Sequence, residues 1–159
     1  MKIRRIIYTT LLIIWMIVIF LFSNQNADNS QSASDKVATS IVDTAEVVTN
    51  QEIPIEDREN FIEDTRVLIR KSAHFMLYFV LGIFTYLTFT SYSISKPVLF
   101  SIIFCFLYAC SDEIHQMFLD GRTAKIMDIF IDTCGSCLAI GMCYFVKRLK
   151  NRKSLVVDA

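Results

Sequence analysis

The chain has 159 residues, a length that fits a single domain, and 53% of them are hydrophobic while 20% are charged. Apolar usage in soluble proteins is about 45–50%. This composition, with a mean hydropathy of +0.44, therefore argues against a soluble domain. The 16 basic and 16 acidic residues balance. A phosphate-binding loop of the type Gly-x-x-x-x-Gly-Lys-Ser/Thr and a basic patch on the predicted outer face are both absent from the sequence. We therefore exclude a helicase and expect no nucleic-acid partner.

The apolar residues cluster in four segments that approach the roughly 20 residues needed to cross a bilayer as helices. The predicted spans cover residues 6–22, 73–93, 97–119 and 126–146. The sequence thus predicts an all-α integral membrane bundle of four transmembrane helices, forming one domain over residues 1–159. The lipid bilayer is its first expected partner.

The first span, residues 6–22, contains no charged residue and follows Lys2, Arg4 and Arg5. A basic start before an apolar run is also typical of a signal peptide. This run is longer than a usual signal core, however, and no Ala-x-Ala cleavage site follows it. We expect an uncleaved span.

A polar outer loop, residues 23–72, separates the first and second spans. Apolar side chains recur there at helical spacing in two groups, Val37, Ile41, Ala45 and Val48, and then, after Pro54 at a helix start, Phe61, Ile62, Thr65, Leu68 and Ile69. The pattern predicts two amphipathic helices over the outer mouth of the bundle, the second running straight into the second span. A mobile polar loop is the alternative.

The basic residues predict the orientation. They cluster in the N-terminal tail at Lys2, Arg4 and Arg5 and in the C-terminal tail over residues 147–153, and such tails favour the cytoplasmic side. We therefore expect a multi-pass protein of the cytoplasmic (plasma) membrane. Its four spans would place both termini in the cytoplasm, and the short loop around Lys96 would lie on the same side. The start of the second span, the end of the third and the start of the fourth face outwards.

Ionisable residues at these outer span ends form the candidate site. Charged groups that face lipid are unfavourable, so we expect them to face the bundle interior or a wet cavity. The predicted ligand-binding residues are Arg70, Lys71, His74, Tyr78, Asp112, Glu113, His115, Gln116, Arg122, Asp128 and Asp132.

Several chemistries fit this set. A histidine beside a carboxylate can act as general acid or base, which makes Glu113, His115 and His74 the catalytic candidates. Arginine and lysine can hold a phosphate or carboxylate at headgroup level. Two histidines and several carboxylates could hold a divalent metal, but the sequence has no close-spaced pair of histidines. We therefore predict no metal site and no cofactor, although the sequence alone leaves metal binding open. A buried hydrogen-bond network that holds the helices in register is the structural alternative.

The string Cys134-Gly135-Ser136-Cys137 has the spacing of a thiol redox motif, but it lies within a predicted membrane helix. We expect a packing role instead. Gly135 and Ala139 would lie on a face of small residues, with Gly141 close by. The other cysteines would fill core or lipid-facing positions.

Three strings occur in a fixed order along the chain. They are Phe22-Ser23-Asn24-Gln25, Arg70-Lys71-Ser72-Ala73-His74-Phe75-Met76-Leu77-Tyr78, and Ser111-Asp112-Glu113-Ile114-His115-Gln116-Met117-Phe118-Leu119-Asp120-Gly121-Arg122, the last followed by Asp128, Asp132 and Gly135. With these strings the sequence resembles the VanZ-like family over almost its whole length. Asn24 departs from the family pattern, which commonly has Ser there. The family is named after an accessory protein of teicoplanin resistance. The resemblance implies a membrane protein of bacterial envelope physiology and supports the candidate site, but it assigns no reaction.

The expected function is to bind an amphiphilic or lipid-linked envelope ligand at the outer polar site and so to affect glycopeptide or peptide-antibiotic susceptibility. A membrane-embedded hydrolase or transferase that acts on a lipid-linked phosphate or glycan is the alternative. A structural polar network in a partner subunit is a further one. The sequence leaves open whether the chain is an enzyme and what its oligomeric state is.

Overall fold

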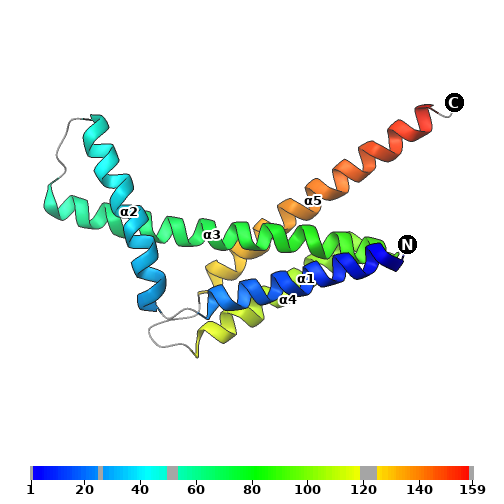
Figure 1. The fold of residues 1–159 in the computed structure, drawn as a ribbon, viewed down its shortest axis with the longest axis horizontal. Helices are drawn as coiled ribbons and strands as arrows, with labels where there is room; N and C mark the ends of the chain where they lie inside the picture. The colour runs from blue at the N-terminus through cyan, green and yellow to red at the C-terminus, as the bar shows by residue number, and fades with distance from the viewer. Residues whose placement is uncertain (1, 25–26, 50–53, 119–124, 158–159) are drawn as a thin grey trace.

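The computed structural model describes residues 2–24, 27–49, 54–118 and 125–157. In these ranges the chain forms five α-helices and no strand, which confirms the all-α prediction. In chain order the helices are α1 (Lys2–Ser23), α2 (Ala27–Thr49), α3 (Ile55–Ser91), α4 (Pro97–Gln116) and α5 (Ile126–Val157). Helices α1, α3 and α4 run alongside one another, α5 crosses α3, and α2 lies at one end of the molecule (Figure 1).

Four of these helices are long and apolar enough to cross a membrane, as predicted. The candidate spans are Lys2–Ser23, Asp57–Ser91, Pro97–Gln116 and Ile126–Asn151. Large apolar side chains on their outer surfaces stay exposed, among them Ile6 at 65%, Leu107 at 59% and Phe130 at 64%. Such a surface suits lipid, where helices satisfy their own backbone hydrogen bonds. The second and third membrane helices end at Ser91 and Gln116, earlier than the predicted residues 93 and 119.

The N-terminus and the C-terminal end of α5 lie toward the same end of the bundle, opposite α2 (Figure 1). Contacts of Arg5 fix this arrangement. Its Nε donates a hydrogen bond of 2.9 Å to the carbonyl oxygen of Ser91 at the end of α3. Its guanidinium also lies over the ring of Tyr92, 5.2 Å from the centroid. The start of α1 and the end of α3 are therefore at one level, as four alternating spans require.

The core lies along α3, which packs against each of the other four helices. Its central residues Tyr78 and Leu81 are fully buried, with Ile19 from α1 and Ile140 from α5. Side-chain bonds to backbone carbonyls tie the helices together where no water is available. The indole nitrogen of Trp15 on α1, for example, donates to the carbonyl oxygen of Leu77 at 2.9 Å.

Small residues let α3 and α5 approach closely. A Cβ atom on Gly82 would lie 2.6 Å from the carbonyl oxygen of Ser136, and one on Gly135 would collide with the carbonyl oxygen of Phe75. Ala139 is buried in the same interface. The predicted small-residue face is thus confirmed for Gly135 and Ala139.

Gly141, the other small residue near this face, does not pack against α3. Nothing lies within 4 Å of a Cβ built on Gly141, so this nearby glycine takes no part in the close packing. The reason is rotational, because Gly141 follows Ala139 by two residues and so points away from α3.

All five cysteines are free thiols, and the Cys134 and Cys137 pair forms no disulfide.

The long polar segment before the second span is largely helical. As predicted, the second of its helices runs unbroken into the membrane, as the 37-residue α3. Pro54 stands at its N-cap position. On the first turns of α3, the predicted face of the amphipathic helix is only partly buried by the rest of the protein. Phe61 and Leu68 are exposed, while Ile62, Thr65 and Ile69 are partly buried.

Helix α2 packs with a different face from the one predicted. Val37, Ile41 and Val48 are exposed, whereas Ala38 and Val42 are fully buried. The side chain of Ala45 lies outside the described residues. Ion pairs accompany this rotation, since Arg58 on α3 pairs with Asp43 and Glu46 on α2, and Arg66 pairs with Asp35.

Helix α2 also takes a different position from the expected one. It contacts α3 and no other described helix. Among the described helices, α2 therefore packs against α3 alone. The prediction that it lies across the outer mouth of the bundle was wrong.

Candidate functional site

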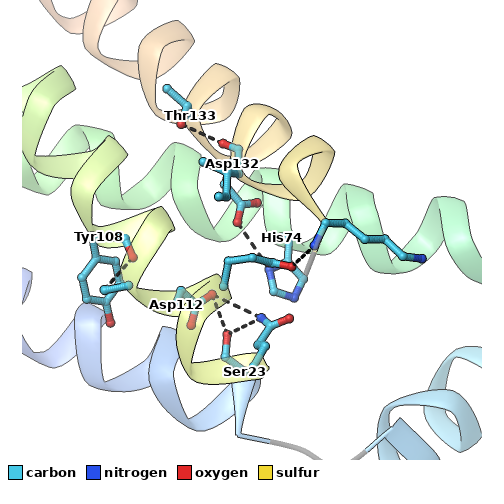
Figure 2. Close-up of polar contacts among 11 residues, drawn as sticks. Ser23, His74, Tyr108, Asp112, Asp132 and Thr133 are labelled. Atoms are coloured by element: carbon cyan, nitrogen blue, oxygen red, sulfur yellow. Dashed lines mark hydrogen bonds and ion pairs between the residues drawn. The ribbon is translucent and has the colours of Figure 1, made fainter. Parts of the chain in front are cut away.

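Polar side chains are buried where α4 ends, at the end of the bundle nearer α2 (Figure 2). Asp112, Glu113 and Gln116 are 6%, 5% and 8% exposed. Asp132, from the second turn of α5, is 3% exposed. Unpaired carboxylates are costly to bury, so their partners define what this end of the bundle does.

Asp112 joins α4 to α1. The hydroxyl of Ser23 donates a 2.8 Å hydrogen bond to Asp112 Oδ2. The side-chain amide of Gln116, one turn further along α4, donates to the same oxygen at 3.4 Å and to the Ser23 hydroxyl at 3.3 Å. Ser23 is fully buried. It was part of the family string but was not among the predicted site residues, although it ends the first span at the level of the site.

Asp132 faces His74 across the α3–α5 interface (Figure 2). The His74 Nδ1 atom lies 3.8 Å from Asp132 Oδ2. The contact follows from the packing described above, because Gly135 lets the two backbones meet at Phe75, next to His74. Ligand-type atoms of His74, Asp112 and Asp132 all lie within 4.8 Å of one another. Three helices thus converge on one point.

Glu113 holds the start of α5. Its Oε1 accepts a 2.5 Å hydrogen bond from the backbone N–H of Lys125, directly before the first residue of that helix. A carboxylate at this position satisfies a free helix N–H and interacts favourably with the positive end of the helix dipole. Asp128, in the first turn of α5, adds a second acid there. Glu113 therefore has a structural role in addition to lining the site.

A small pocket lies between these side chains. It is lined by Arg70, Lys71, His74, Glu113, Gln116, Asp128, Ile131 and Asp132. Its volume of about 20 Å³ has room for one water molecule or ion, since a water needs roughly 10–15 Å³ by this measure. Among the ion pairs of the described residues, none joins Arg70 or Lys71 to one of these carboxylates.

Two carboxylate oxygens around the pocket have no hydrogen-bond partner among the described residues. They are Oδ1 of Asp128 and Oδ1 of Asp132. The fully buried Tyr78 lies close to Asp112 and Asp132, and its hydroxyl is within hydrogen-bonding reach of Asp112. Native proteins leave few buried polar groups unsatisfied, so this concentration marks a place where a further partner fits.

The structure does not bring every predicted residue together. His115 lies toward α1, where its Nε2 is 3.3 Å from Asn24 Oδ1 and its ring stacks on Phe20 with centroids 4.7 Å apart. It does not line the pocket. Arg122 lies outside the described residues. Ile131 lines the pocket, and no polarity signal in the sequence marked it.

These features define a class of protein. It is a polytopic helical membrane protein that places buried carboxylates beside a partly buried histidine at one end of its bundle. A family model described as VanZ/LLP1 matches residues 8–147. The chain belongs to the VanZ/LLP1 family, as the ordered strings predicted. No curated protein and no solved structure matches the chain.

Proposed function

We propose that this protein binds an anionic amphiphile, such as a lipid-linked envelope precursor, at the pocket end of its bundle. It would thereby alter susceptibility to glycopeptide or peptide antibiotics. One observation carries the proposal. Arg70 and Lys71 line the pocket, and neither pairs with a carboxylate of the described residues.

The size of the pocket supports a ligand that lies at its mouth. A volume of about 20 Å³ is far below the roughly 300–1,000 Å³ of a pocket that encloses a small molecule. The ligand headgroup would therefore lie across the mouth, within reach of Arg70 and Lys71, while its apolar chains follow the exposed apolar surface of the spans. A guanidinium can bind a phosphate through two parallel hydrogen bonds, and the ammonium of lysine adds a point charge.

Charge supports an outer location for this site. Basic residues gather at the opposite end of the bundle, including Arg5, Lys96, Lys147 and Arg148. Short segments rich in Lys and Arg favour the cytoplasmic side of a membrane. In the cytoplasmic (plasma) membrane, this orientation directs Arg70 and Lys71 to the outer leaflet, where lipid-linked precursors are used and glycopeptides act.

The test compares two pairs of charge removals. Replacing Arg70 and Lys71 together by Ala should abolish both the susceptibility phenotype and the binding of an anionic lipid-linked phosphate to the purified protein. The matched control replaces Lys147 and Arg148, the same residue types at the far end of the bundle. Both variants must reach wild-type abundance in the membrane. Unchanged lipid binding in the Arg70 and Lys71 variant would contradict the proposal.

A second candidate function is hydrolysis or group transfer on such a lipid. The His74–Asp132 pair favours it, because a carboxylate that orients a histidine is the usual arrangement of a general base. The geometry shifts this role from Glu113, whose Oε1 is bound to the backbone of α5, to His74. Turnover of a lipid-phosphate or lipid-glycan substrate by purified protein, lost in His74→Ala, would support it. Absence of turnover would contradict the enzymatic role and leave ligand binding as the proposed function.

A further inference from the structure

Three helices bring oxygen and nitrogen ligand atoms to a single point inside the pocket end of the bundle. His74 comes from α3, Asp112 from α4 and Asp132 from α5, and their ligand atoms lie within 4.8 Å of one another. We infer that these residues bind a divalent first-row transition-metal ion of the Mn²⁺ or Zn²⁺ class. A contact between this ion and a phosphate headgroup would rest on the proposed function. Binding of the ion itself is independent of that function.

The distances suit a metal site. Bonds from zinc to nitrogen or oxygen are about 2.0–2.2 Å long, so neighbouring ligand atoms around such an ion lie roughly 3.0–3.5 Å apart. His74 Nδ1 and Asp132 Oδ2 are 3.8 Å apart. Small rotations of the three side chains would close the set around an ion. The pocket beside them, with a volume of about 20 Å³, holds one ion or water.

The charges at this point also call for a cation. Asp112 and Asp132 are buried, and Glu113 lies beside them at 5% exposure. Within the described part of the chain, the ion pair of Asp132 with His74 is the single one that involves any of these carboxylates. Arg70 and Lys71 line the adjoining pocket but form no ion pair with these carboxylates, and buried carboxylates without a direct partner are strongly unfavourable. A divalent ion at the cluster would supply that charge.

An independent observation points to a missing ligand. Asp132 is 3% exposed, and its Oδ1 has no hydrogen-bond partner among the described residues although its Oδ2 faces His74. A polar atom this deeply buried is normally satisfied, and this one belongs to a residue of the three-ligand cluster.

The mixed donor set selects the class of ion. Imidazole nitrogen favours transition metals over Mg²⁺ and Ca²⁺, which prefer oxygen ligands alone, and carboxylates ligate both Mn²⁺ and Zn²⁺, with Zn²⁺ bound more tightly at a given site. Three protein ligands leave coordination positions open, as in catalytic zinc sites. An open position would face the pocket lined by Arg70 and Lys71, so a phosphate oxygen could complete the coordination there.

The three residues were among the predicted ligand-binding residues, but the sequence did not single them out as a metal site, because its 2 histidines are far apart. The prediction of no metal rested on the lack of a close-spaced pair. Here the ligands come from three helices, and the fold, not a local motif, assembles them.

Mn²⁺ is the sharper probe because thiolates bind Zn²⁺ well and Mn²⁺ poorly, and the chain has 5 cysteines. The full chain, purified in detergent and stripped of metal with a chelator, is titrated with Mn²⁺ while the paramagnetic resonance signal of the free ion is recorded. We expect one Mn²⁺ per chain, displaced by Zn²⁺ and not by an equal concentration of Mg²⁺. His74→Ala and Asp132→Asn should each weaken binding at least about tenfold.

His115→Ala and Asp57→Asn are the matched controls, since they remove the same residue types outside the cluster, and they should bind Mn²⁺ as the wild type does. Helical circular dichroism and gel filtration establish that each variant is folded. Should the cluster variants not fold, the wild type decides, because the proposal fails if it takes up no Mn²⁺ or gains no thermal stability from Zn²⁺. Stoichiometric binding that survives both cluster substitutions would also overturn it. No lipid is present, so this result and the test of headgroup binding can fail separately.

Discussion

His74 on α3 and Asp132 on α5 face each other with 3.8 Å between Nδ1 and Oδ2, a contact made possible by Gly135. This glycine lies three residues after Asp132 and packs against the backbone of Phe75, the residue that follows His74. A packing feature of the helix interface thus sets the geometry of the polar site. Substitutions that push the helices apart should therefore affect both stability and the site.

Gly135→Ala should destabilise the protein. Its added Cβ would collide with the carbonyl oxygen of Phe75, which is backbone and cannot rotate away. Overpacking of this kind costs about 1–3 kcal/mol, and we expect a lower thermal unfolding temperature in detergent by fluorescence-detected gel filtration. Gly141→Ala is the control on the same helix. Nothing lies within 4 Å of its Cβ, and alanine favours helix by about 1 kcal/mol over glycine, so this variant should be equally or more stable. Equal behaviour of the two variants would contradict the close packing.

Ser23→Ala should weaken the link between α1 and α4. The substitution removes the 2.8 Å hydrogen bond to Asp112 Oδ2 and leaves that buried oxygen with the longer bond from Gln116. Leaving a buried acceptor poorly satisfied costs about 1–3 kcal/mol. The comparison is Ser111→Ala on the exposed side of α4, where the hydroxyl bonds only to its own helix at the carbonyl oxygen of Tyr108. Thermal unfolding should separate the two, and a loss as large in Ser111→Ala would argue against the assigned role of Ser23.

The orientation is tested by labelling from one side. In a chain whose own cysteines are replaced, a cysteine at Glu59 on the first turns of α3 should react with a membrane-impermeant maleimide in intact cells. A cysteine at Lys150 near the end of α5 should react only after the membrane is opened. Four spans place these positions on opposite sides, and the basic residues place Lys150 inside. The reverse pattern of labelling would show the inverted topology, with the candidate site on the cytoplasmic face of the membrane.

Hydropathy predicted much of this fold. The 4 spans were confirmed, and so was the run of the helix after Pro54 into the membrane, because length and apolar content are properties of the segment itself. The level of the polar residues along the bundle follows from the same reasoning. Arg70 and His74, at helical spacing, do line one pocket with Asp132.

Rotation about the helix axis was harder to predict. The face that α2 presents to α3 carries the buried Ala38 and Val42 and is flanked by ion pairs such as Arg58 with Asp43, and no spacing within α2 itself reveals these contacts with another helix. On α4, by contrast, the sequence held a signal that was missed. Glu113 and His115 are two residues apart, which is about 200° of rotation, so they cannot share a face.

The two histidines provide the most direct test of the site, because they are alike in chemistry and lie at the same end of the bundle. His74 lines the pocket and pairs with Asp132, while His115 stacks on Phe20 beside Asn24. We expect His74→Ala to lose the antibiotic-susceptibility phenotype while its abundance in the membrane stays at the wild-type level. His115→Ala should keep the phenotype and lose at most about 1 kcal/mol of stability, the contribution of one aromatic contact at the rim. Susceptibility assays, with abundance checked by immunoblot, give the answer. Loss of the phenotype in His115→Ala alone would move the site from the interface of α3 and α5 to the surface between α1 and α4.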